Sequence, residues 1–290
     1  MVLVALLVIF ILILIVILYD INNFTLDSHI CEDDRVKALR KVCVIADLHN
    51  HSFGKNNKRL LHELYMENPD RIFIAGDLFN ASRRSLNKNA IKFMENLALD
   101  DAAPWHGRIY FSYGNHEMKL LRNPEKYRTD FAAAVRRMKD LGIHILDNSF
   151  VEDDGVIIAG INIPKELYKK RLKKLPDGED IRRIIGFDAD DRTVLLAHNP
   201  EFFPAYEEWG ARVVFSGHVH GGIVRLPKLG GMISPRLRLF PKYDGGIYRL
   251  NDSLMILSRG LSWHTLPIRF MNAGELIMME FRKQQDGYSR

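Results

Sequence analysis

The segment KVCVIADLH, residues 41–49, places two candidate metal ligands directly after a short apolar strand. The run from Val42 to Ala46 predicts a buried β-strand, because a short, bounded apolar run is typical of a sheet core. Asp47 and His49 follow that run. Four further apolar runs along the chain also end in a candidate ligand: RIFIAGD (71–77), RIYFSYGN (108–115), RTVLLAH (192–198) and ARVVFSGH (211–218).

Helical segments separate several of these strands. Periodic apolar positions predict helices over 57–69, 85–100 and 123–142. A further strand over 156–163 and the C-terminal segments GGIYRL, SLMILSRG and ELIMMEF predict a mixed second sheet. The alternation of strands and helices indicates α/β layers. We expect one domain over residues 41–283, followed by a short tail at 284–290.

The N-terminal segment MVLVALLVIFILILIVIL is apolar throughout, and no charged residue occurs before Asp20. About 20 apolar residues cross the ~30 Å hydrocarbon core of a bilayer. We therefore expect a single-pass transmembrane anchor at residues 1–19, with residues 2–19 in the membrane, and a linker at 20–40. A cleaved secretory signal is disfavoured by the lack of a positive n-region and of a small-residue cleavage site. Few Lys and Arg residues flank the anchor, so the side of the membrane stays open.

The composition narrows the choice of partner. The formal net charge is +5, and the excess of basic residues lies after residue 40. Such a balance suits a phosphate-bearing partner or an anionic membrane surface. Basic residues without interleaved aromatics disfavour a nucleic-acid partner, and no protein partner is indicated. Cys31 and Cys43 provide no disulfide framework.

The polar residues at the strand ends predict a metal site, because ligands of α/β sheets bind beyond the carboxyl ends of the strands. Imidazole and carboxylate together suit zinc, iron or manganese better than calcium or magnesium. The ligands exceed what one ion needs, whereas two ions sharing a bridging carboxylate would use them all. With Asn115 in place of a third aspartate, such a centre keeps a positive charge for a phosphoryl group. Two metals can also lower the pKa of bound water.

Five motifs carry a resemblance to a known family: DLH (47–49), GDL (76–78), GNHE (114–117), AH (197–198) and GHVH (217–220). Together they resemble the calcineurin-like metallophosphoesterase superfamily over residues 42–282. The tail resembles the compact, often membrane-anchored bacterial branch, which includes enzymes similar to UDP-2,3-diacylglucosamine pyrophosphatase. The resemblance implies a layered α/β/β/α sandwich with two mixed sheets, here preceded by one N-terminal transmembrane helix. The segment GDLFNAS departs from the GDxVDRG pattern of the protein-phosphatase branch.

The resemblance also implies the roles of individual residues. His116 would protonate the leaving oxygen or stabilise its charge, and Glu117 would orient the His116 ring. Asp77 would bridge two divalent metals (Mn, Fe or Zn) that carry the attacking hydroxide. The first metal would be held by Asp47, His49, Asp77 and His220, and the second by Asp77, Asn115, His198 and His218.

Other segments are candidates for contact with a substrate, which we expect to be a phosphate-containing small molecule or lipid. Asn50 follows the first motif, and Arg259 and His264 lie in the C-terminal segment RGLSWHTLP, although a solvated loop or ordinary packing explains each of them as well. The basic segment 165–176 predicts an amphipathic helix, either solvated or on an anionic membrane surface. Residues 225–243 are interrupted by Gly and Pro and fit a loop over the metals.

Three functions remain in competition. The first is a metal-dependent phosphodiesterase or pyrophosphatase, favoured by the complete ligand set and by His116. The second is a catalytically silent metal-binding scaffold, which a missing ligand would have favoured. The third is a nuclease of the same superfamily, which the composition makes the weaker alternative.

Overall fold

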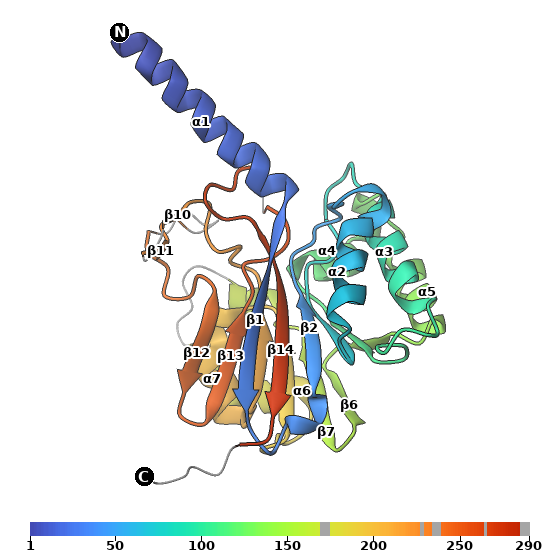
Figure 1. The fold of residues 1–290 in the computed structure, drawn as a ribbon. Helices are drawn as coiled ribbons and strands as arrows, with labels where there is room; N and C mark the ends of the chain where they lie inside the picture. Colours follow the sequence, from blue (N-terminus) through green and yellow to red (C-terminus); the bar gives the residue numbers. More distant parts are fainter. Residues whose placement is uncertain (169–174, 227–228, 234–238, 264–265, 285–290) are drawn as a thin grey trace.

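The computed structural model describes residues 1–168, 175–226, 229–233, 239–263 and 266–284 (Figure 1). The helices are α1 (Val2–Asn22), α2 (Lys58–Glu67), α3 (Lys88–Ala98), α4 (Asn115–Arg122), α5 (Phe131–Asp140), α6 (Gly178–Ile185) and α7 (Phe203–Trp209). The strands of the first sheet are β1 (Phe24–Glu32), β2 (Lys41–Ile45), β3 (Arg71–Ala75), β4 (Ile109–Ser112), β5 (His144–Leu146) and β14 (Gly274–Arg282). Those of the second are β6 (Ser149–Asp153), β7 (Val156–Ile161), β8 (Thr193–Ala197), β9 (Val213–Ser216), β12 (Gly246–Leu250) and β13 (Ser253–Leu257). A short hairpin consists of β10 (Arg225–Leu226) and β11 (Gly230–Gly231).

Both large sheets are mixed. The first has the strand order β1-β14-β2-β3-β4-β5, and the second has the order β12-β13-β9-β8-β7-β6. Strands β2 to β5 run parallel, whereas β14 is antiparallel to β2. In the second sheet β7, β8, β9 and β13 run parallel, and β6 and β12 close its edges as antiparallel strands. The five predicted strands that precede a candidate ligand are thus confirmed, each ending one to three residues before that ligand. The segment ELIMMEF, which we expected in the second sheet, forms β14 of the first sheet instead, between β1 and β2.

The side chains of β2 show why the layers stack as they do. Val42 and Val44 point into the core between the two sheets, where Phe73 meets Phe215 with ring centroids 5.4 Å apart. Cys43 and the alternate positions after it pack against α2 to α5 instead, since successive side chains of a strand face opposite sides. A third core joins the far face of the second sheet to α6 and α7. The α/β/β/α sandwich with two mixed sheets is therefore confirmed.

Two further sequence-based expectations were wrong in detail. The predicted linker at 20–40 contains β1, which pairs in parallel with β14 over its whole length of nine residues. Its sequence, FTLDSHICE, is half polar because it forms an exposed sheet edge, so it lacks the apolar run of a core strand. The predicted helix over 123–142 is shorter, and a separate helix, α4, begins at Asn115 itself.

Helix α1 projects from the body of the protein, and its apolar side chains are exposed (Figure 1). In length and composition it is sufficient to cross a membrane. Its last turn is fixed to the domain, because the buried Asp20 carboxylate accepts a hydrogen bond from the backbone N–H of Asn272 at 2.9 Å. The guanidinium of Arg59 also donates to the carbonyl of Asn22 and to Oδ1 of Asn23.

A chain that begins at residue 41 is expected to be markedly less stable than one that begins at residue 20. The deletion removes β1 and turns the apolar strand β14 into an open sheet edge, which favours aggregation. Loss of the burial of Phe24 and Cys31 alone costs about 3 kcal/mol, or about 6–12 °C in Tm. Thermal unfolding by circular dichroism and gel filtration would measure both effects. Equal melting temperatures for the two chains would show that β1 adds nothing to the fold.

Candidate metal centre

Loops from both sheets converge at one end of the sandwich. Asp47 and His49 follow β2, Asp77 follows β3, and Asn115 opens α4 after β4. The second sheet contributes three histidines from the loops after β8 and β9. The carboxyl ends of parallel strands therefore deliver all seven predicted ligands to one place: Asp47, His49, Asp77, Asn115, His198, His218 and His220.

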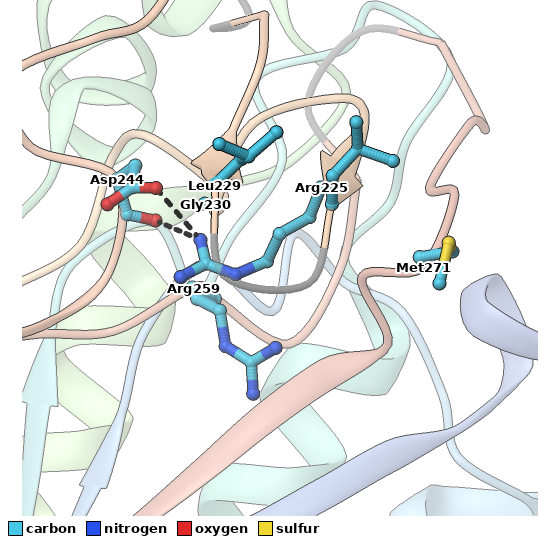
Figure 2. A pocket seen from close by; sticks show the side chains of 7 residues that line it. Arg225, Leu229, Gly230, Asp244, Arg259 and Met271 are labelled. Atoms are coloured by element: carbon cyan, nitrogen blue, oxygen red, sulfur yellow. Dashed lines mark hydrogen bonds and ion pairs between the residues drawn. The ribbon is translucent and has the colours of Figure 1, made fainter.

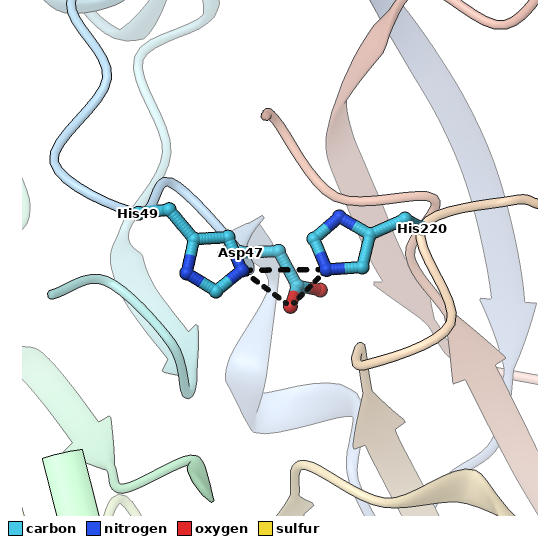
Figure 3. Close-up of side chains that lie close together, drawn as sticks. All are labelled: Asp47, His49 and His220. Carbon is cyan, nitrogen blue, oxygen red and sulfur yellow. Dashed lines mark hydrogen bonds and ion pairs between the residues drawn. The ribbon is translucent and has the colours of Figure 1, made fainter. Parts of the chain in front are cut away.

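The first cluster consists of Asp47, His49 and His220 (Figure 3). Asp47 Oδ1 lies 3.3 Å from Nε2 of His220 and 3.6 Å from Nε2 of His49. The two histidine Nε2 atoms are 3.3 Å apart. All three side chains are buried, so three ligand atoms point at one shielded position.

The second cluster consists of Asp77, His198 and His218. Asp77 Oδ2 lies 3.2 Å from Nε2 of His198 and also 3.9 Å from Nε2 of His49, which belongs to the first cluster. His198 Nε2 in turn lies 3.8 Å from Asp47 Oδ1. The Asp77 carboxylate therefore stands between the two clusters, where the sequence-based hypothesis of a bridging ligand requires it.

Buried polar atoms in the site fit divalent cations. Asp47 Oδ1 is fully buried and accepts no hydrogen bond from the residues that the structure describes, a costly arrangement for a carboxylate without a positive partner. The side-chain amide of Asn115 lies 2.9 Å from Nδ1 of His218, so two potential metal ligands converge. The donor set of imidazole, carboxylate and amide oxygen suits zinc, iron or manganese.

The electrostatics of the site favour positive charge. Burial alone would raise the pKa of Asp47, but the facing rings of His220 and His198 hold it below its ordinary value. Burial alone would lower the pKa of His198, yet the carboxylates of Asp77 and Asp47 raise it to about 10. Two ionised carboxylates thus create a negative field strong enough to attract protons, and the same field would attract divalent cations.

Backbone carbonyls fix the orientation of two of the rings. His198 Nδ1 lies 2.7 Å from the carbonyl of Ala75, and His220 Nδ1 lies 2.8 Å from the carbonyl of Ser262. Because a carbonyl can only accept, each Nδ1 carries a hydrogen, and Nε2 is the ring nitrogen that would bind a cation in place of a proton. Such outer contacts are typical of metal-binding histidines.

The backbone at the site is held in a costly conformation. Five of the seven candidate ligands have positive φ, which costs non-glycine residues of order 1–3 kcal/mol each; they are Asp47, His49, Asp77, His218 and His220. Close packing maintains this arrangement. A Cβ on Gly217, for example, would lie 2.5 Å from Oδ2 of Asp47, the oxygen that accepts the backbone N–H of His218. Gly217 of GHVH is therefore needed for the ligands to converge.

His116 and Glu117 lie beside the clusters, but each of them contacts other groups than the sequence predicted. Nδ1 of His116 accepts the backbone N–H of Ala81 at 2.9 Å. The buried Glu117 carboxylate instead accepts the N–H groups of Asp77, Phe79 and Gly114. The prediction that Glu117 orients the His116 ring was therefore wrong. Glu117 fixes the loop that carries Asp77, and burial together with Asp77 raises the pKa of Glu117 to about 7.

The candidate substrate contacts have other partners. Asn50 Oδ1 accepts the N–H groups of Asn89 and Ala90 at the start of α3, so Asn50 fixes a loop. Arg259 donates through Nε to Glu275 Oε1 at 2.7 Å. Its side chain also lines a cavity of about 470 Å³ (Figure 2), whose other lining residues are Arg225, Leu226, Leu229, Gly230, Asp244 and Met271. His264, and residues 169–174 of the basic segment, lie outside the described residues.

The sequence did not reveal Asn272, which supports the site from behind. Its buried side-chain amide donates to the carbonyls of His220 and Gly222 at 2.8 and 2.7 Å. Its backbone N–H donates to Asp20 at the end of α1. One residue therefore joins the last turn of the N-terminal helix to the loop of a candidate metal ligand. A single asparagine in the segment RFMNAG carries no motif that could have predicted this role.

Comparison with known proteins agrees with this geometry. The family described as calcineurin-like phosphoesterase matches residues 40–222. The chain is 25% identical over 252 residues to an uncharacterized metallophosphoesterase of Campylobacter jejuni, covering 83% of this chain and 59% of that protein. It is 29% identical over 90 residues to an uncharacterized metallophosphoesterase of Bacillus subtilis, covering 31% of each chain. The match thus spans less than two thirds of the length of these two relatives.

Among solved structures, the chain is similar to the NAD nucleotidase of Haemophilus influenzae. The TM-score is 0.37 at 15% identity, and the match covers 77% of this chain and 45% of that one.

Proposed function

This chain belongs to the calcineurin-like phosphoesterase family, and from that premise we propose that it is a membrane-anchored, metal-dependent hydrolase of phosphoester or pyrophosphate bonds. The main support is the position of the Asp77 carboxylate, within 4 Å of histidines from both ligand clusters. This geometry fits two cations better than one, because each cluster has its own aspartate–histidine set.

We assign one cation to Asp47, His49, Asp77 and His220, and the other to Asp77, Asn115, His198 and His218. Both would be manganese, iron or zinc. When bound, they would supply Lewis acidity and lower the pKa of an attacking water. The chain itself holds these ligands with fixed tautomers, because carbonyls bind Nδ1 of His198 and of His220.

His116 is proposed to act on the leaving oxygen. Its Nδ1 accepts the N–H of Ala81, so the neutral ring carries its hydrogen on Nε2 and can donate from that atom. One of its ring nitrogens also lies within 4.8 Å of ligand atoms of Asp77 and His49, which places the ring at the edge of the centre. A proton held there would pass to the oxygen that leaves phosphorus.

Membrane anchoring is supported by the exposed apolar surface of α1 and by its length. The buried contact between Asp20 and Asn272 holds the end of this helix against the domain. Extraction of membranes at alkaline pH, followed by mass determination of the intact chain, would test this part. Release of a shortened chain would identify the segment as a signal sequence.

Hydrolysis is expected when the full chain, in detergent, meets Mn²⁺ and bis-p-nitrophenyl phosphate, and EDTA should abolish it. The assay would be repeated with Fe²⁺ and Zn²⁺ and with phosphomonoesters, nucleotides and nucleotide-sugar lipids, and the bound metal would be measured on the same sample. Stoichiometric metal without turnover of any substrate would favour the silent scaffold. Preferential cleavage of DNA, with affinity that falls steeply as salt rises, would favour the nuclease.

A further inference from the structure

A second cavity, of about 640 Å³, opens beside the base of α1, and none of the residues that line it is a candidate metal ligand. Strand β1 contributes the apolar side chains of Phe24 and Leu26. Helix α2 contributes polar and charged side chains from its first two turns. The lining residues are Phe24, Leu26, Lys58, Arg59, His62 and Glu63. None of them belongs to the proposed catalytic machinery.

The position of this cavity relative to a bilayer follows from the length of α1. The apolar run from Val2 to Leu18, at 1.5 Å per residue, covers about 26 Å, close to the ~30 Å hydrocarbon core. Asn22 lies four residues further, about 6 Å beyond that run and therefore at the depth of the lipid headgroups. Arg59 donates hydrogen bonds to Asn22 and Asn23 at 3.1 and 2.8 Å. The cationic wall of the cavity thus lies in the headgroup layer.

The lining combines the two properties that a phospholipid headgroup requires. Lys58 and Arg59 provide two cations and Glu63 provides one carboxylate, so these three side chains together carry one net positive charge. That charge matches a phosphodiester, which carries a single negative charge. Phe24 and Leu26 offer apolar surface to the glycerol and the first carbons of the acyl chains, and the Arg59 guanidinium lies 5.8 Å from the Phe24 ring centroid.

Lys58 is the side chain available for this role. It is exposed and forms no hydrogen bond or ion pair with the part of the chain that the structure describes. Lys41, in contrast, is paired with Glu67 at 2.8 Å. We propose that this cavity binds the phosphodiester headgroup of an anionic membrane lipid. The proposal rests on the anchoring part of the proposed function, and it gives the domain a second contact with the membrane surface.

Titration of the full chain with phosphatidylglycerol in detergent, followed by native mass spectrometry, would test the site, with phosphatidylcholine as the neutral comparison. Lys58→Glu is expected to weaken the binding of the first phosphatidylglycerol at least about 5-fold, because the lining loses its net positive charge. Lys88→Glu is the matched control: Lys88 is also the exposed first residue of a helix after an asparagine, but it does not line the cavity. That variant should bind the lipid within about 2-fold of the original chain.

Equal weakening by both variants would mean general charge attraction, and no weakening by either would mean that the cavity binds no lipid; each result overturns the proposal. Competition by sn-glycerol 3-phosphate at the lipid's own concentration would also overturn it, because the site would then recognise soluble phosphate. Hydrolysis of bis-p-nitrophenyl phosphate should be the same in both variants. If the original chain lacks this activity, the proposed hydrolase function is contradicted instead. If the chain is released from membranes, the proposed membrane anchoring is contradicted.

Discussion

Asp77→Ala is expected to lower kcat/KM by at least about 10⁴-fold, equivalent to about 5.4 kcal/mol of transition-state stabilisation. Asp77 is the carboxylate that both ligand clusters share, with Oδ2 at 3.2 Å from His198 and 3.9 Å from His49. Its Oδ1 also accepts the backbone N–H of His116 at 2.7 Å. The substitution therefore removes a ligand from both proposed cations and releases the backbone that positions the proposed proton donor.

The measurement should combine steady-state kinetics with metal analysis of the same purified sample. We expect the variant to retain less than half of the original metal content, whereas Asp101→Ala, at an exposed acid outside the site, should retain all of it. A melting temperature close to that of the original chain would show that the loss is local. Near-full activity with an unchanged metal content would mean that Asp77 does not bridge the cations.

The features that the sequence predicted well are local along the chain. A short apolar run followed at once by Asp, Asn or His contains both a buried strand and the ligand at its carboxyl end, as in the segment from Val42 to Asp47. Parallel pairing then brings such ends together without further information, as β2 and β3 do for Asp47 and Asp77. The strand ends and the ligand cluster could therefore be predicted from short windows.

The features that the sequence did not predict depend on tertiary contacts between distant segments. The half-polar strand β1 is recognisable only beside β14, some 250 residues later in the chain. Asn272 binds the carbonyl of His220, 52 residues earlier in the chain, and the carboxylate of Asp20, 252 residues earlier. Glu117 follows His116 directly, which suggested that it holds that ring, but α4 turns its carboxylate towards the N–H groups of Asp77 and Phe79. Adjacent positions in the sequence did not indicate a side-chain contact between these two residues, because successive side chains of a helix point about 100° apart.

His116→Ala is expected to keep the full metal content but to lower kcat by about 10²–10⁴-fold, the typical contribution of a positioned proton donor. The ring is bound through Nδ1 by the N–H of Ala81, so removing it leaves the ligand clusters in place and takes away the hydrogen on Nε2. The loss should depend on the leaving group. It should be small for p-nitrophenolate, which leaves readily as an anion, and large for an alkoxide, which needs the proton.

Comparison of aryl and alkyl phosphodiesters therefore separates proton donation from a structural role, since a disturbed site would lose both activities equally. The exposed His106→Ala variant, outside both ligand clusters, controls for loss of an imidazole as such and should match the original chain on both substrates. If His116→Ala loses metal, His116 is a metal ligand instead. The hydrogen bond from Ala81 disfavours this role for Nδ1, whereas Nε2 can still bind a cation. The metal content of this one variant thus decides between a ligand and a proton donor.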